Sequence, residues 1–129
     1  MTARIVTLIL AIMLTLPAAV QAARQLPVVN VAIVADGSSE RVTSVRTLFL
    51  EEMQAVNRGE FDLQAPADLQ LDADRTLAGV RATLDKVLTD PRTDIVVTLG
   101  ALGSHIAAQR VSLPKPTVAP FISNHGIQD

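Results

Sequence analysis

Three short segments of the chain are rich in small polar residues that could hold a small ligand: residues 36–39, 100–104 and 120–124. Small side chains leave backbone N–H groups accessible, and N–H groups at the start of a helix can donate to an anion or a carboxylate. The serine hydroxyls could add hydrogen bonds. The same residue types are also common in turns and helix caps, so their presence alone is consistent with ligand binding or with a purely structural role.

Catalytic and metal-binding patterns are poor by comparison. His105 and His125 are the only histidines, and neither has metal-ligand spacing with a carboxylate. Ser104 does not stand in a G-x-S-x-G nucleophile motif. Gly100 and Gly103 lack the third glycine of a dinucleotide fingerprint. We therefore expect no catalytic residue, no bound metal and no cofactor.

The N-terminus has the pattern of a secretory signal peptide. Arg4 precedes an apolar run of twelve residues, Pro17 ends that run, and small residues lead to Ala22. A membrane-spanning helix needs about 20 apolar residues, so this run is too short for one. We predict that residues 1–22 are removed after Ala22, with Ala23 as the second choice, and that the mature chain is soluble and periplasmic.

Charge and composition argue against nucleic-acid-binding and cysteine-dependent proteins. Without Arg4 the mature chain has ten basic and 13 acidic residues, a net charge of −3. The three phenylalanines are not interleaved with Arg or Lys, so nucleic-acid binding has no support. With no cysteine there is no disulfide and no thiolate chemistry. Residues 23–129 are enough for one small domain with a packed core.

The elements that would position the small polar segments begin with a strand. Residues 28–35 form a nearly continuous β-branched run, which is typical of a strand buried on both faces of a parallel sheet. The next apolar residues recur at helical spacing and predict one apolar stripe, made of Val42, Val45, Leu48, Phe49, Met53 and Val56. Gly59 could then adopt the left-handed conformation that ends a helix.

The middle of the chain predicts a weaker strand and a second helix. Apolar residues alternate with polar ones over 61–71, which favours a strand. Because Pro66 cannot donate to a β-ladder, we expect an edge strand or a strand split at that proline. Residues 72–74 supply a turn and an N-cap. Apolar residues from Leu77 to Leu88 then fall on one helical face, which should end before Pro91.

The last third completes a βαβ series. Residues 95–99 predict a buried strand, Ser104 could cap a short helix, and residues 117–122 predict a fourth strand. The order β-α-β-α-β-α-β, with long crossovers, indicates an α/β fold with an open, doubly wound parallel sheet. In such sheets ligands bind beyond the carboxyl ends of the strands, where all three small polar segments should converge.

The local strings resemble a known family. Residues 94–109 combine Asp, a hydrophobic run, Gly and a small-residue turn with a serine that opens a helix. Residues 113–123 follow with the form P-x-hydrophobic-x-P, and residues 31–39 add a first strand with a polar loop. This pattern, over residues 28–124, resembles type 1 periplasmic solute-binding proteins, especially the branched-chain amino-acid receptors.

The resemblance implies a receptor that captures a small molecule, such as an amino acid or another small metabolite, and passes it to an ABC transporter permease. It implies that the fold is the N-terminal half-lobe of the periplasmic-binding-protein type 1 fold. In the family, the turn after the third strand holds the ligand carboxylate, a role that falls here on residues 101–104. The ligand contacts carried over from the family are Ser38, Ser39, Ala101, Leu102, Ser104 and Ser123.

The chain departs from the family in two respects, and other functions stay open. Family members continue into a fifth strand, a hinge and a second lobe, so we expect a truncated receptor or a non-functional fragment. Ala101 and Leu102 are less polar than the usual amino-acid-receptor turn, which leaves the ligand class open. The alternatives are a periplasmic sensory or partner-binding module on the same lobe, and a periplasmic enzyme, for which no catalytic base is evident.

Overall fold

The computed structural model describes residues 25–121. The predicted signal peptide, at residues 1–22, and Ser123 lie outside these residues. The elements are β1 (Val28–Ala35), α2 (Glu40–Asn57), β2 (Asp62–Gln64), the 3₁₀ helix η1 (Ala67–Leu69), β3 (Gln70–Asp72), α3 (Leu77–Thr89), β4 (Ile95–Leu99), α4 (Ala101–Ala108) and β5 (Thr117–Val118). None of the helices within these residues is long and apolar enough to cross a membrane.

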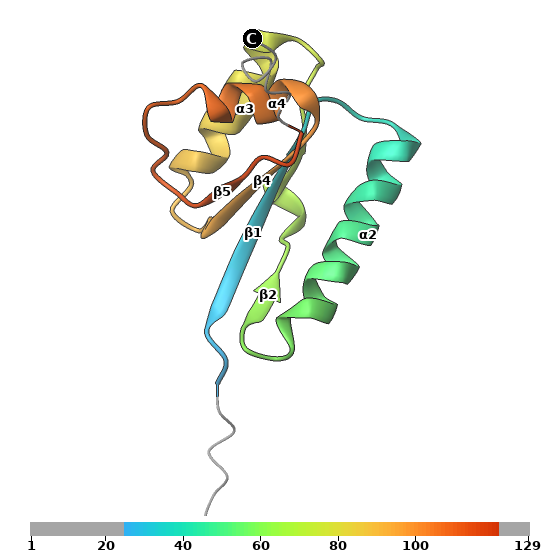
Figure 1. Ribbon diagram of the computed structural model, residues 1–129, viewed down its shortest axis with the longest axis vertical. Helices are drawn as coiled ribbons and strands as arrows, with labels where there is room; N and C mark the ends of the chain where they lie inside the picture. The colour runs from blue at the N-terminus through green and yellow to red at the C-terminus, as the bar shows by residue number, and fades with distance from the viewer. Residues whose placement is uncertain (1–24, 122–129) are drawn as a thin grey trace, which may run out of the picture.

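The five strands form a parallel sheet with β1 near its centre, as Figure 1 shows. On one side β1 pairs with β2 through its first half and with β3 through its second half. On the other side β1 pairs with β4, and β4 pairs with β5. The strand order therefore reverses between β1 and β4, and the α/β class with a parallel sheet is confirmed.

The weak second strand is split at Pro66, as predicted. β2 ends at Gln64 and β3 begins at Gln70, with η1 between them. The N–H of Leu69 donates to the carbonyl of Pro66 at 2.9 Å, which closes the 3₁₀ turn. The side chain of Leu69 is buried in the core. The interruption thus turns one edge strand into two short ones without opening the core.

Alternate residues of the strands supply two separate cores, one on each face of the sheet. On the first face, Ala32, Val34 and Val96 pack against α3 and α4. On the second face, Ile33 and Val97 pack with residues of α2. Figure 1 shows α2 on one side of the sheet and α3 with α4 on the other. This arrangement follows from the two-residue period of a strand.

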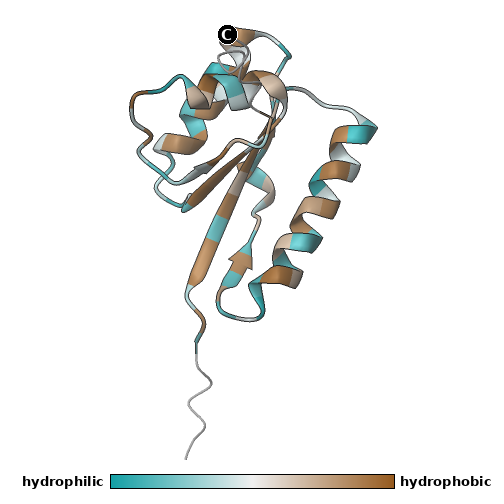
Figure 2. Cartoon of the chain, in the orientation of Figure 1, coloured by the Kyte–Doolittle hydropathy of each residue, from teal (hydrophilic) through white to brown (hydrophobic). Residues whose placement is uncertain are grey.

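The predicted single apolar stripe of α2 divides into two. Val42, Phe49 and Met53 pack against the sheet. Val45, Leu48 and Val56 instead have exposed fractions of 40%, 60% and 70%. No residue of α2 is fully buried, and Figure 2 shows hydrophobic residues alternating with hydrophilic ones along the helix. The prediction of one buried stripe was wrong. At about 100° per residue, Val45 and Leu48 lie towards one side of the arc, away from the sheet, whereas Val56 shares the direction of Phe49 but lies in the last turn of the helix.

One helix end agrees with the prediction, and two helix starts differ from it. Helix α2 ends at Asn57 and Gly59 has the predicted left-handed backbone (φ 73°), although Arg58 before it is also left-handed (φ 50°). The N-cap of α3 is Thr76, whose hydroxyl accepts from the N–H of Gly79 at 3.0 Å. Helix α4 begins at Ala101, so Ser104 lies inside the helix and is not its cap. The small residues of 100–104 are therefore a first helical turn.

Candidate functional site

The carboxyl ends of β1, β4 and β5 meet at one edge of the sheet. The carboxylate of Asp36, directly after β1, contacts the first turn of α4. The N–H of Phe121, shortly after β5, donates to Oγ of Ser104 at 3.3 Å. The parts of the three polar segments that the structure describes are therefore close together, as parallel strands require.

Asp36 caps helix α4, a contact that the sequence analysis did not predict. Its Oδ2 accepts from the N–H of Leu102 and its Oδ1 from the N–H of Gly103, both at 2.8 Å. Negative charge at this position satisfies two unpaired helix donors and complements the positive end of the helix dipole. The acid at the end of β1 is thus used within the chain to fix α4 against β1.

Gly100 allows this carboxylate to approach. Its φ is 150°, a conformation that residues with a Cβ rarely adopt, and a Cβ there would lie 2.3 Å from Cγ of Asp36. Gly103 is also close, since a Cβ there would lie 3.2 Å from Oδ1 of the same residue. The two glycines make room for an internal carboxylate.

The turn at residues 101–104 therefore differs from the expected ligand-carboxylate site. Two of its N–H groups already donate to Asp36, and the N–H of Ser104 donates to the carbonyl of Gly100 at 3.2 Å. The side chain of Leu102 packs against the core beneath α3 and α4, whereas Ala101 is exposed. Three of the four backbone donors that the family resemblance assigns to a ligand, those of residues 102–104, are therefore occupied in this structure.

Ser104 has a structural environment. Its side chain is fully buried, and its Oγ lies 2.9 Å from Oγ1 of Thr98, which is also fully buried. The N–H of Phe121 donates to the same oxygen. A buried hydroxyl needs such partners because leaving it unpaired would be costly. Ser104 thus links β4, α4 and the segment after β5.

The two serines after β1 have different surroundings. Ser39 is the N-cap of α2, and its Oγ accepts from the N–H of Val42 at 3.2 Å. Ser38 is exposed, and its carbonyl accepts from the guanidinium of Arg75 at 2.7 Å. Of the predicted ligand contacts in the described part of the chain, Ser38 and Ala101 are the exposed ones without a capping or core role.

Residues after β3 hold the loop after β1 in place. Arg75 has a left-handed backbone (φ 66°), and its N–H donates to the carbonyl of Asp36 at 2.8 Å. Its side chain lies so close to Gly37 that a Cβ there would be 2.4 Å from Cγ of the arginine. Hydrogen bonds from the side chain and backbone of Thr76 lower the pKa of Asp74 below its ordinary value of 3.8. These contacts connect the loop after β1 to the segment after β3.

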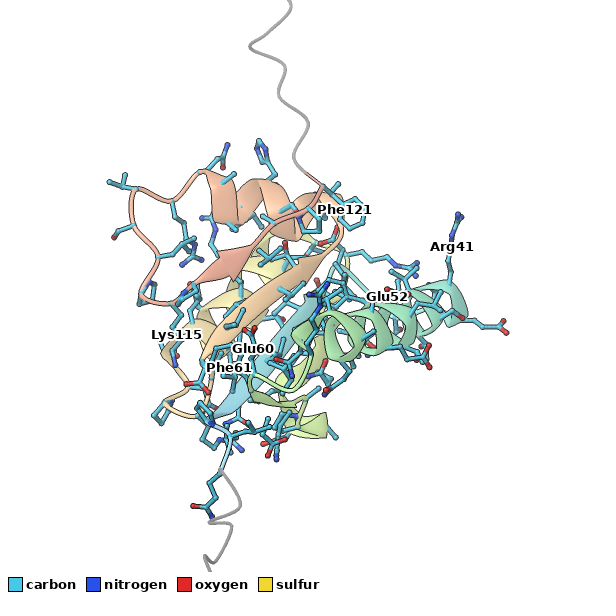
Figure 3. The ribbon with its side chains drawn as sticks, turned by 60° about the horizontal axis from the view of Figure 1, so that its bottom comes forward. Arg41, Glu52, Glu60, Phe61, Lys115 and Phe121 are labelled. Atoms are coloured by element: carbon cyan, nitrogen blue, oxygen red, sulfur yellow. The ribbon has the colours of Figure 1, made fainter. Side chains whose placement is uncertain are left out.

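A crevice of about 320 Å³ lies at this edge, where the strand order reverses. It is lined by Arg41, Val42, Val45, Leu99, Gly100 and Phe121. The walls are mostly apolar, and the lining residues include one cation. Figure 3 shows Arg41 extending from the first turn of α2 and Phe121 at the end of the described chain. Apolar walls with few polar groups are typical of small-molecule sites.

A larger hollow, of about 700 Å³, lies at the opposite end of the sheet. It is lined by residues around the start of β1, the end of α2 and the start of β2, including Gln25, Asn57 and Phe61. Ligands of open parallel sheets bind at the carboxyl ends of the strands. We therefore place the candidate site in the smaller crevice.

The side chains that line the crevice are apolar apart from the guanidinium of Arg41. None of the six lining side chains is a general acid or base that titrates near neutral pH. Within residues 25–121 no group of three side chains is placed to hold a metal ion. Comparison of the chain with models of protein families, with curated proteins and with solved structures finds no match.

Proposed function

We propose that this chain is the ligand-binding lobe of a type 1 periplasmic solute-binding protein that serves an ABC importer. The observation that carries the proposal is the crevice at the carboxyl ends of β1 and β4, because strand-order reversal is where open parallel sheets bind small molecules. The transport role rests on the resemblance of residues 28–124 to that family. The half-lobe assignment is supported by the parallel α/β sheet.

The crevice suggests the class of ligand. Val42, Leu99 and the half-exposed ring of Phe121 offer apolar contacts, and the guanidinium of Arg41 can pair with an anion. Because Asp36 occupies the donors at the start of α4, a ligand carboxylate would be recognised by Arg41. A small aliphatic molecule with one carboxylate fits these features. The crevice is open on one side, so we expect weak binding by this lobe alone.

Ligand-induced stabilisation tests the proposal. The exported chain would be heated with branched-chain amino acids and short aliphatic carboxylates, each in large excess, while unfolding is followed by circular dichroism. A ligand that binds only the folded state raises Tm in proportion to the logarithm of its concentration. We expect at least one of these probes to raise Tm, and calorimetric titration to give a saturable isotherm.

Matched variants locate the site. Arg41→Gln should weaken binding about fivefold, equivalent to ~1 kcal/mol for an exposed ion pair. Arg58→Gln removes an exposed arginine at the other end of α2 and should leave binding unchanged. Equal losses in both variants would place the ligand elsewhere. No stabilisation by any probe would instead favour the sensory or partner-binding alternative.

A further inference from the structure

Four exposed side chains follow one line along α2: Arg41, Val45, Leu48 and Glu52. They are spaced by four, three and four residues, which places them on one face of an α-helix. We call this line the α2 stripe. Figure 3 labels the two charged residues, Arg41 near the start of the helix and Glu52 in its second half. The stripe thus has an aliphatic centre with opposite charges at its ends.

The described part of this chain leaves much of the α2 stripe in solvent, with exposed fractions of 40% for Val45 and 60% for Leu48. Val45 and Leu48 are exposed, whereas the residues that attach α2 to the sheet lie further round the helix. Neither Arg41 nor Glu52 takes part in the four ion pairs found among residues 25–121. An exposed aliphatic surface flanked by uncompensated charges is typical of a protein interface.

The spacing of the stripe is symmetric about the midpoint between Arg46 and Thr47. A two-fold axis through that point, perpendicular to the helix, exchanges position 41 with position 52 and position 45 with position 48. In an antiparallel pair of helices, Arg41 of each copy would therefore face Glu52 of the other copy. Val45 of each copy would face Leu48 of the other. A parallel pair would place like charges together.

We propose that the α2 stripe is the interface of a homodimer in which two copies of α2 pack antiparallel about a two-fold axis. Self-complementarity of one surface is the requirement for such an isologous contact. The stripe meets it twice, once through its charges and once through its aliphatic residues. The polar neighbours of the stripe on the outer side, such as Thr47 and Glu51, would stay in solvent.

The apolar surface continues from the stripe onto the end of the sheet. Arg41 and Val45 border the crevice together with Phe121, whose ring is half exposed, and Val118 of β5 is also exposed. The second copy would therefore cover the rim of the crevice as well as the helix. Stable dimers usually bury at least ~1,200 Å². A contact centred on one helix pair is near or below that limit, so we expect a micromolar dimer.

Charge reversal and exchange test the proposed pairing without any ligand. Sedimentation velocity of the exported chain, over the micromolar range, should show a monomer–dimer equilibrium. Arg41→Glu and Glu52→Arg each place like charges opposite one another and should weaken dimerisation about tenfold or more. The double variant R41E/E52R restores both opposite pairs and should return the dissociation constant to near its original value.

Glu51→Arg is the matched control. It makes the same charge change as Glu52→Arg one residue away, on a part of the helix outside the stripe, and should not change dimerisation. Leu48→Asp should abolish the dimer, whereas Thr47→Asp should not. Circular dichroism would verify that each variant is folded. If Leu48→Asp fails to fold, the charge-exchange series still decides, because its positions are exposed.

Three results would overturn the proposal: a monomer throughout the concentration range, equal effects of Glu51→Arg and Glu52→Arg, or no recovery in the double variant. Arg41 also lines the crevice, so the dimer is separated from the ligand test by Glu52→Arg, whose position does not line it. A monomer that is stabilised by an aliphatic carboxylate would retain the proposed function and remove the dimer. A dimer that no ligand stabilises would retain the proposed interface and remove the proposed ligand-binding function.

Discussion

On one face of the sheet, α3 and α4 insert side chains that are fully buried, among them Val80, Leu84 and Val87. On the other face, α2 contributes only partly buried side chains such as Phe49 and Met53, and no residue of this longer helix is fully covered. The strand residues beneath are buried on both faces. The sheet is thus protected on both sides, but the helices are attached to it unequally.

The unequal attachment of the helices suggests a different role for each face of the sheet. The α3–α4 face has two helices over the strands and buries most of their apolar residues, although Leu77 at the start of α3 is 57% exposed. This face should therefore supply most of the stability. The α2 face has one helix, and apolar surface remains exposed on the helix and at the end of β5. The crevice and the proposed dimer interface both lie on that face. Under the two proposals, stability and recognition therefore use opposite faces of the same sheet.

The largest difference between the two faces is expected when one leucine on each is replaced by alanine. Leu84 in α3 is fully buried, so Leu84→Ala should lower the free energy of unfolding by about 2–5 kcal/mol. Leu48 in α2 is exposed, so Leu48→Ala should change it by less than about 0.5 kcal/mol. Urea denaturation at low protein concentration, where the monomer predominates, measures both. Similar losses at both positions would contradict the unequal attachment.

A second test compares the glycine before α4 with the glycine after α2. Gly100→Ala forces a Cβ into the Asp36 carboxylate at an unfavourable φ and should cost about 3 kcal/mol of stability. Gly59→Ala also places alanine at positive φ, but nothing lies within 4 Å of the added Cβ. It should cost about 1 kcal/mol. If both variants lose the same amount of unfolding free energy, the close approach of Asp36 to Gly100 does not contribute to the cost of the added Cβ.

The smallest effect is expected for the buried hydroxyl pair beneath α4. Ser104→Ala leaves the hydroxyl of Thr98 with a weaker set of partners and should cost about 1–2 kcal/mol. Thr98→Val together with Ser104→Ala removes both polar groups and should cost less than the sum of the single changes. Ser112→Ala, at an exposed serine, is the control and should be neutral. Additive losses in thermal unfolding would show that the two hydroxyls are not coupled.

The sequence predicted the strands well where burial is two-sided. Residues 28–35 and 95–99 are strands with the predicted bounds, because a continuous run of β-branched residues fits few other environments. Pro66 also predicted the split edge strand, since the missing N–H is a local property. These features depend on residues that are close in sequence, so a single chain without structure is enough to reveal them.

The candidate site was less predictable because its key contact is long-range. Asp36 and the N–H groups that it caps are 66 and 67 residues apart. A signal existed, namely an acid directly after the first strand and two glycines after β4 that leave space for it. The sequence could not show whether that space holds an internal carboxylate or a ligand. Likewise, helical spacing placed Val45 and Leu48 on an apolar stripe, but only the position of the sheet shows that they face outward.

The central place of β1 has a consequence for synthesis of the protein. Ala35, at the end of β1, pairs with Asp72 and with Leu99, both far downstream. At ~5–20 residues per second, a ribosome needs several seconds to reach β4 after it has made β1. During that time β2 and β3 are made and can pair with one edge of β1, but its other edge has no partner. An unpaired strand edge can associate with other chains, so β1 is open to such association until residues 95–99 have been made.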